Sequence, residues 1–145
     1  MAATTDEIRL GELTIRYLLA GGDTDGGVAL FEFRVPAGAK VPAAHSHDGY
    51  DEIVYGLAGV LTWTVDGDEV EMRAGEVLFV PRGAVHRFEN RGGADAAALA
   101  VATPGLLGAE YFLEMAAVVG AATSGPPDPA ALADVMLRHG LTPAP

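Results

Sequence analysis

The sequence contains no cysteine, a single lysine (Lys40) and no long apolar run. Without cysteine, the chain has no disulfide, no thiolate nucleophile and no thiolate metal ligand. One lysine leaves one candidate for Schiff-base chemistry. Because no run reaches about 18 apolar residues, we expect no membrane-spanning helix, and the first ten residues lack the apolar core of a signal peptide. These absences favour a cytoplasmic protein.

Positive charge is also scarce, with 9 Lys and Arg against 20 Asp and Glu and a formal net charge of −11. Nucleic acids and anionic membrane surfaces both require clustered basic side chains, so neither is an expected partner. A small-molecule substrate is the expectation that remains. Since 50% of the 145 residues are hydrophobic, the chain is long and apolar enough to fold as a compact unit.

Short apolar segments separated by Gly, Pro and Asp turns occupy the chain from about Leu13 to Thr103. Asp66-Gly67 is a typical hairpin turn, because both residue types tolerate the positive φ that tight turns require. Short strands at regular spacing favour an all-β sandwich or barrel over βαβ units. The predicted strands are Leu13–Leu19, Val28–Val35, Ile53–Leu57, Val60–Val65, Glu69–Met72, Val77–Val80, Val85–Glu89 and Ala96–Val101.

The composition changes after the predicted strands, and two helices are expected there. Residues 108–119 place Tyr111, Phe112 and Met115 on one helical stripe, which either covers one end of the barrel or packs as an ordinary amphipathic face. After a Gly-Pro-rich break, Asp128 can cap a second helix that begins with Pro129 and ends at Gly140. We therefore expect a barrel over residues 1–105 and C-terminal helices over 106–145 that pack on it, because about 40 residues are too few for a core of their own.

Three of the four histidines gather around one acidic residue in a pattern typical of a metal site. His45 and His47 are two residues apart, so on a strand they project from the same face. Glu52 has the opposite parity, which requires a kink that Asp48-Gly49 can supply. His86 has to arrive from a neighbouring strand. Imidazole and carboxylate ligands suit several divalent transition metals; the alternative is that each histidine is exposed or hydrogen-bonded in the core.

The two segments that carry these residues resemble the paired motifs of the cupin superfamily. The first motif spans residues 38–59 and reads Gly38…His45-x-His47-x4-Glu52-x6-Gly59, with one residue more than usual between the first Gly and the first His. The second spans residues 75–90 and reads Gly75-x5-Pro81-x-Gly83-x2-His86-x3-Asn90. The resemblance implies a jelly-roll barrel, the cupin double-stranded β-helix, with a short C-terminal helical extension. It also implies a homodimer and one divalent ion (Fe, Ni, Zn, Cu or Mn) per chain, with His45, His47, Glu52 and His86 as ligands.

Several residues near the motifs are candidates for catalysis or for a substrate pocket. Glu52 either stays a metal ligand or takes the substrate proton. Tyr50 shares strand parity with Glu52, so it either donates its hydroxyl to a substrate oxygen or packs at the barrel mouth. The candidates for an apolar pocket wall, each of which could instead be ordinary core, are Val54, Trp63, Phe79 and Phe88.

The resemblance leaves the reaction open, because this fold supports many activities. The first hypothesis is an oxygenase that resembles the quercetin dioxygenases and acts on a small enolisable or aromatic substrate. The second is a redox-neutral isomerase or cyclase that uses the same metal, as in polyketide cyclisation. The third is a non-catalytic cupin that binds a small ligand. A complete ligand set argues against the metal-free storage proteins of the superfamily.

Overall fold

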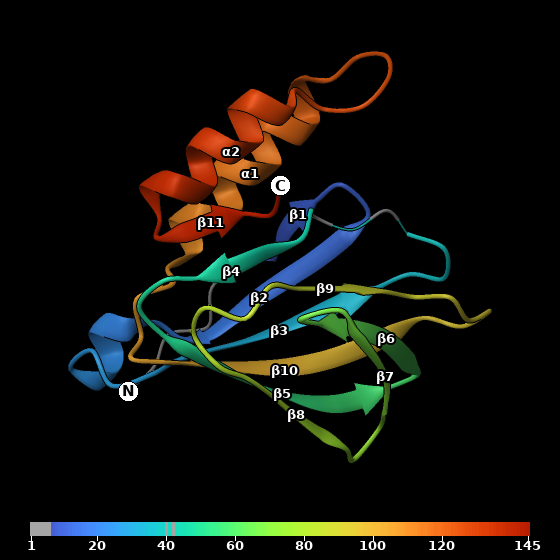
Figure 1. The fold of residues 1–145 in the computed structure, drawn as a ribbon, viewed down its shortest axis with the longest axis vertical. Helices are drawn as coiled ribbons and strands as arrows, with labels where there is room; N and C mark the ends of the chain where they lie inside the picture. The colour runs from blue at the N-terminus through green and yellow to red at the C-terminus, as the bar shows by residue number, and fades with distance from the viewer. Residues whose placement is uncertain (1–6, 40, 42) are drawn as a thin grey trace.

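The computed structural model describes residues 7–145 except 40 and 42, and it confirms the all-β prediction with two short helices at the C-terminal end (Figure 1). In this part of the chain, one sheet has six strands in the order β1-β2-β3-β10-β5-β8 and the other has five in the order β11-β4-β9-β6-β7. The strands are β1 Ile8–Leu10, β2 Leu13–Leu19, β3 Ala29–Val35, β4 His45–His47, β5 Asp51–Ala58, β6 Val60–Val65, β7 Asp68–Arg73, β8 Val77–Val80, β9 His86–Glu89, β10 Ala96–Thr103 and β11 Leu141–Pro143. A 3-10 turn, η1 Gly21–Thr24, joins β2 and β3.

Alternating apolar residues build the core between the two sheets. In β2, the residues Leu13, Ile15 and Tyr17 are buried, and Phe31 and Phe33 alternate in the same way along β3. Burying a side chain of this size stabilises the fold by about 1.5–3 kcal/mol. The central strand β10 instead buries a row of alanines.

The predicted hairpin at Asp66-Gly67 joins β6 to β7. Both residues have positive φ, at 48° and 87°, and Val65 pairs directly with Asp68 across the turn. This geometry is that of a two-residue hairpin loop whose backbone twist matches that of the strands.

The C-terminal helices pack against one end of the barrel (Figure 1). They are α1 Ala109–Ala121 and α2 Pro129–Arg138. As predicted, Asp128 caps α2 by accepting a hydrogen bond from the Ala130 amide at 3.0 Å, and Pro129 occupies the first turn. Glu114 on α1 contacts both Arg138 and His139 at the end of α2, which ties the two helices together. With 13 and 10 residues, neither of these helices has the length needed to cross a membrane.

The segment after α2 returns to the barrel, which the sequence analysis did not anticipate. Gly140 turns the chain with a φ of 80°, and β11 then pairs with β4 along its whole length. Backbone hydrogen bonds from Asp48 to Gly140 and from Ala144 to Ala44 extend this pairing at both ends. The last residues of the chain therefore support the strand that carries two of the candidate metal ligands.

Candidate metal centre

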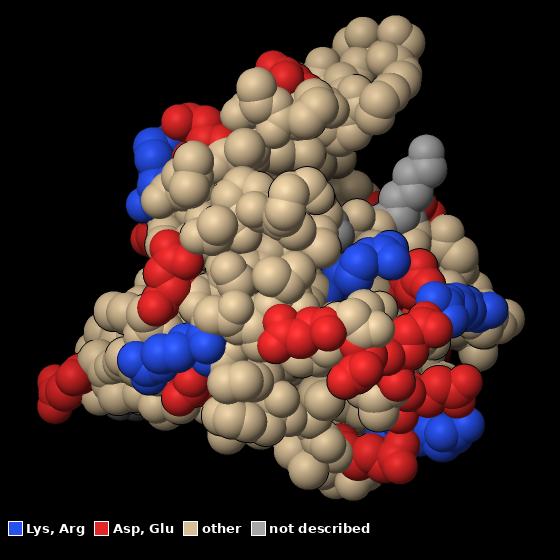
Figure 2. Space-filling model, in the orientation of Figure 1, with Lys and Arg blue, Asp and Glu red and all other residues tan. Residues whose placement is uncertain are grey.

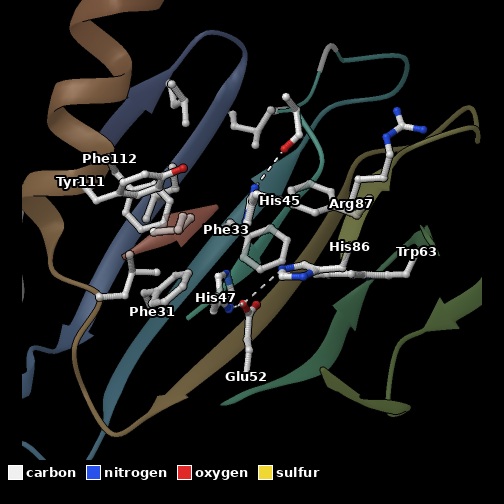
Figure 3. Close-up of a pocket in the computed structure, with 17 residues that line it drawn as sticks. Phe31, Phe33, His45, His47, Glu52, Trp63, His86, Arg87, Tyr111 and Phe112 are labelled. Atoms are coloured by element: carbon white, nitrogen blue, oxygen red, sulfur yellow. Dashed lines mark hydrogen bonds and ion pairs between the residues drawn. The ribbon is translucent and has the colours of Figure 1, made fainter. Parts of the chain in front are cut away.

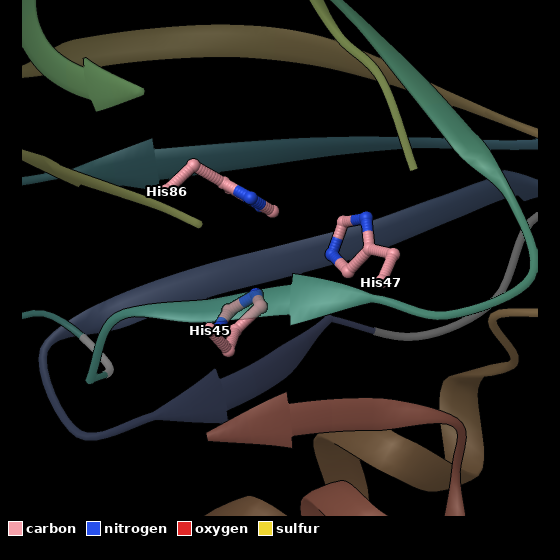
Figure 4. Close-up of side chains that lie close together, drawn as sticks. All are labelled: His45, His47 and His86. Atoms are coloured by element: carbon pink, nitrogen blue, oxygen red, sulfur yellow. The ribbon is translucent and has the colours of Figure 1, made fainter. Parts of the chain in front are cut away.

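Three histidines and one glutamate from different strands meet inside the barrel. His45 and His47 lie on β4, and His86 is the first residue of β9, where it pairs with His45. One side-chain nitrogen from each of the three histidines lies within 4.8 Å of the corresponding nitrogens of the other two (Figure 4). Glu52 comes from β5 in the opposite sheet, and the chain crosses between the sheets through a bend at Asp48-Gly49, where the kink was predicted.

Backbone carbonyls fix the orientation of two of the three imidazole rings. Nδ1 of His45 lies 2.9 Å from the carbonyl oxygen of Ala43, and Nδ1 of His86 lies 3.0 Å from that of Ala84. A carbonyl only accepts, so each Nδ1 carries the proton and donates it. The lone pair of each ring is therefore on Nε2, as in histidines that ligate a metal through Nε2.

The third ring, His47, has a buried nitrogen without a hydrogen-bond partner. Its Nδ1 lies 3.6 Å from Oε1 of Glu52, beyond hydrogen-bond distance, and the side chain of His47 is only 3% exposed. The same carboxylate oxygen lies 3.9 Å from Nε2 of His86. A buried polar atom without a partner costs roughly 1–3 kcal/mol, and an ion between these groups would satisfy it.

Burial sets the protonation states of the four side chains. Burial, reinforced by repulsion from His86, lowers the pKa of His45 to about 4 and, with a further contribution from His45, lowers that of His47 to about 2. Burial also lowers the pKa of His86. In contrast, burial raises the pKa of Glu52 to about 7, because it disfavours the carboxylate. The histidines are therefore neutral at physiological pH, and the contacts with Glu52 are not ion pairs.

This donor set fits a divalent transition ion. The three imidazoles are in the neutral form that binds metals, two of them carry a free lone pair on Nε2, and the third has an unsatisfied nitrogen. The Glu52 carboxylate is close enough to add an oxygen ligand and a negative charge. Such mixed nitrogen and oxygen sets accept Fe, Ni, Zn, Cu and Mn.

The four side chains lie on the wall of a cavity that is otherwise mostly apolar (Figure 3). Aromatic rings surround the histidines, and Trp63 stacks on His86 with ring centroids 6.2 Å apart. The other lining residues are Leu10, Leu13, Ile15, Phe31, Phe33, Ala43, Arg87, Phe88, Leu107, Tyr111, Phe112 and Leu141. Polar groups placed in such surroundings interact more strongly than they do in water.

The structure brings two of the four predicted pocket residues to the cavity wall, namely Trp63 and Phe88. Val54 is fully buried in the core and does not line the cavity. Phe79 was predicted to form part of the pocket wall, but its side chain is 56% exposed and pairs with Ile53 on the outer face of its sheet. Its strand, Val77–Val80, consists of four consecutive apolar residues, so no alternation distinguishes the inner face from the outer.

Of the two interpretations of Tyr50, the structure agrees with packing. Tyr50 precedes β5, and its ring stacks on His47 with centroids 4.4 Å apart. Its hydroxyl is buried without a hydrogen-bond partner among the described residues, and the residue does not line the cavity. Tyr50 and Glu52 are both buried, as their shared parity predicts, but Tyr50 packs against His47 and not into the cavity.

Most other wall residues were not named in advance as site residues. The alternation within β2 and β3 could have assigned Leu13, Ile15, Phe31 and Phe33 to the inner face. Tyr111 and Phe112 belong to the predicted helical stripe of residues 108–119. Both side chains line the cavity, so this part of the stripe covers one end of the barrel. No local signal identifies Leu141, because its position depends on the long-range pairing of β11 with β4.

Comparison with known proteins agrees with this architecture. Residues 31–102 match the Cupin domain family. The chain is 35% identical over 92 residues to an oxalate-binding protein of Thermotoga maritima, covering 63% of this chain and 75% of that protein. It is 30% identical over 83 residues to quercetin 2,3-dioxygenase of Bacillus subtilis, covering 57% of this chain but only 24% of that enzyme.

A solved structure supports the same assignment. The crystal structure of a predicted oxalate decarboxylase from Thermotoga maritima superimposes with a TM-score of 0.63 and 28% sequence identity. The superposition covers 71% of this chain and 93% of the other. The two-sheet barrel, the two motifs and these similarities lead to one conclusion: the chain belongs to the cupin family.

Proposed function

We propose that this cupin is a metal-dependent oxygenase of the quercetin dioxygenase type that acts on a small enolisable or aromatic substrate. The observation that carries the proposal is the convergence of three neutral imidazoles and one carboxylate on the wall of an aromatic cavity. The similarity to quercetin 2,3-dioxygenase supports it. A dioxygenase inserts both atoms of O2 into its substrate, so the reaction requires no separate reductant.

In this proposal His45, His47, His86 and Glu52 hold one ion of Fe, Ni, Zn, Cu or Mn. A divalent ion bound there supplies Lewis acidity and open positions for oxygen ligands. Glu52 lies beside His47 and His86, where its carboxylate either stays a metal ligand or accepts the proton that an enolisable substrate loses on binding. The apolar wall excludes water, and the rings of Phe33, Trp63 and Phe88 offer surfaces against which a planar substrate can stack.

The proposal is tested by oxygen uptake. The protein is loaded separately with each of the five metals and assayed with flavonols, catechols and β-diketones. We expect O2 consumption with at least one pairing of metal and substrate, and a loss of at least about 100-fold in kcat for Glu52→Gln if Glu52 takes the proton. No O2 consumption in any pairing would contradict the oxygenase assignment.

A redox-neutral isomerase or cyclase is the second candidate, and the position of Glu52 favours it. The carboxyl group lies beside His47 and His86, where it is placed to move a proton between two carbons of a substrate. Turnover under nitrogen, supported by redox-inactive zinc, would favour this candidate over the oxygenase. Tight binding of a small ligand with no product under either atmosphere would instead identify a binding protein.

We also propose a homodimer formed through the outer face of β5 and β8. Five large apolar side chains lie exposed on this face, namely Ile53, Tyr55, Leu57, Val77 and Phe79. The two strands are hydrogen-bonded neighbours, with Tyr55 paired with Val77 and Ile53 paired with Phe79. At roughly 200 Å² of full exposure per side chain, their exposed fractions of 37–67% correspond to roughly 500 Å² of apolar surface. This is near the upper end for a monomer and more than half of what one partner buries in a standard interface.

The opposite sheet offers a different surface. The face in Figure 2 carries basic side chains interspersed with carboxylates. On β7, Arg73 pairs with Glu71, and Glu69 pairs with Arg91. Light scattering after size exclusion tests the dimer: Phe79→Glu should convert it to a monomer, whereas Leu113→Glu, which alters an exposed residue of α1, should not. A monomeric wild type would contradict the proposed dimer.

A further inference from the structure

Among the polar groups on the cavity wall that have no role in the proposed metal centre is the hydroxyl of Tyr111. Tyr111 lies in the first turn of α1, outside residues 31–102 that match the family. Its side chain lines the cavity, and Figure 3 shows its hydroxyl directed toward the histidine side. Tyr111 is the one tyrosine among the described wall residues.

The hydroxyl of Tyr111 differs from those of the two neighbouring buried tyrosines. Tyr17 donates its hydroxyl to the carbonyl oxygen of Leu107 at 2.8 Å. Tyr50 has a hydroxyl that is enclosed behind His47 and does not reach the cavity. Tyr111 is 3% exposed, and its hydroxyl makes no hydrogen bond to any residue that the structure describes. It is therefore a donor held at the cavity without an internal partner.

The surroundings of Tyr111 fix its ring before any ligand binds. Phe112 and His139 contact the ring edge-to-face, with centroids 5.0 and 5.7 Å away. Glu114, one turn along α1, contacts His139 and Arg138, and the bond from Tyr17 to Leu107 anchors the chain just before the helix. A donor held in place in this way loses little entropy when a ligand binds.

The protonation state of Tyr111 suits a donor. Burial raises the pKa of the phenol, and the negative charge of Glu52 raises it further. The hydroxyl therefore keeps its proton throughout the physiological range.

We propose that Tyr111 is a substrate-contacting residue that donates a hydrogen bond from α1 to a second oxygen of the ligand. This inference rests on the proposed metal-dependent function, in which the first oxygen of the ligand lies at the histidines. It narrows the substrate class to small molecules that carry two oxygen functions joined by an apolar body. The aromatic wall between the two polar ends accommodates that body.

The test measures the binding of hydroxamates to the Co²⁺-loaded protein, followed by the visible absorption of the metal. Alkyl hydroxamates of five to seven carbons are compared with analogues of equal length that carry a ketone at carbon 4, 5 or 6. Each pair differs in one distal oxygen. The proteins are wild type, Tyr111→Phe and the matched control Tyr50→Phe, which removes a phenol hydroxyl near His47 that does not reach the cavity. Thermal unfolding verifies that each variant is folded.

We expect at least one ketone analogue to bind wild type about 3- to 10-fold more tightly than its alkyl parent, as one neutral hydrogen bond allows. Tyr111→Phe should abolish this preference without changing the affinity for the alkyl parent, and Tyr50→Phe should retain it. The same preference in Tyr111→Phe, or no preference in wild type for any pair, would overturn the role of Tyr111 while leaving the metal centre intact. Failure of every hydroxamate to perturb the Co²⁺ spectrum would overturn the proposed function and this inference with it.

Discussion

Metal binding by this protein should release one proton, and that proton should come from Glu52. At pH 6 a carboxyl with a pKa of about 7 is about nine-tenths protonated, and a bound cation expels that proton. His45 and His47 contribute almost nothing at this pH, because their pKa values lie near 4 and 2, and burial lowers the pKa of His86 and so reduces its contribution. The expected release at pH 6 is therefore about 0.9 proton per metal.

Isothermal titration calorimetry measures this number directly. The heat of Co²⁺ or Ni²⁺ binding is recorded at pH 6 in buffers with different enthalpies of ionisation, and the slope gives the protons released. Wild type should give about 0.9, and Glu52→Gln, which has no titrating carboxyl, should give less than about 0.2. At pH 8 the value for wild type should fall to about 0.1, because Glu52 is then already ionised.

Two results would refute this reasoning. A release near zero in wild type at pH 6 would mean that Glu52 is ionised before the metal arrives, so burial does not raise its pKa. An equal release in Glu52→Gln would mean that the proton comes from a histidine, which contradicts the neutral imidazoles. Metal binding with no contribution from Glu52 would leave His45, His47 and His86 as the ligand set.

Three further predictions concern stability and the support of the site. In the metal-free protein, the pKa of Glu52 is higher folded than unfolded, so its contribution to stability is present below about pH 4.5 and is lost as the pH rises toward 7. In urea unfolding, the free energy of unfolding of Glu52→Gln should therefore rise by about 3 kcal/mol relative to that of wild type between pH 4.5 and pH 7. The same difference between variant and wild type at both pH values would contradict this prediction. Asn90 donates to Val35 and Ala94 and accepts from the Gly92 amide, so Asn90→Ala should cost about 2–3 kcal/mol, and a loss below about 0.5 kcal/mol would argue against this network. Deleting residues 141–145 removes the strand paired with β4 and should weaken Ni²⁺ binding at least about 10-fold. The control Thr142→Val removes only a side-chain hydrogen bond to Asp48 and should change the affinity for Ni²⁺ little. Wild-type affinity in the deletion variant would show that β4 needs no support from β11.

Local patterns in the sequence predicted most of the barrel. All eight predicted strands are present, with bounds that differ by at most two residues, because period-two alternation and Gly or Pro turns are local signals. β1, β4 and β11 are not among the predicted strands, because each has three residues, too few for alternation to identify a strand. β1 forms a tight hairpin with β2, in which Leu10 pairs with Leu13, whereas β11 pairs with β4, which is far away in the sequence.

The features of the candidate site that depend on local strand geometry could be predicted from the sequence. The parity of His45 and His47, and the need for a bend before Glu52, both follow from strand geometry. The tyrosine that faces the cavity could not be selected by parity, because Tyr50 precedes its strand and Tyr111 comes from a helix whose docking is set by tertiary contacts. The roles of the ligands and of Glu52 in catalysis stay predictions.

The most direct test of the metal centre is the metal content of the protein after saturation with Ni²⁺ and exhaustive dialysis. We predict one ion per chain for wild type and, for the double variant His47→Ala and His86→Ala with an unchanged circular dichroism spectrum, less than about 0.1 ion per chain. Wild type that keeps no metal, whether Ni²⁺, Fe²⁺, Zn²⁺, Cu²⁺ or Mn²⁺, would contradict the account, as would a double variant that binds as much metal as wild type.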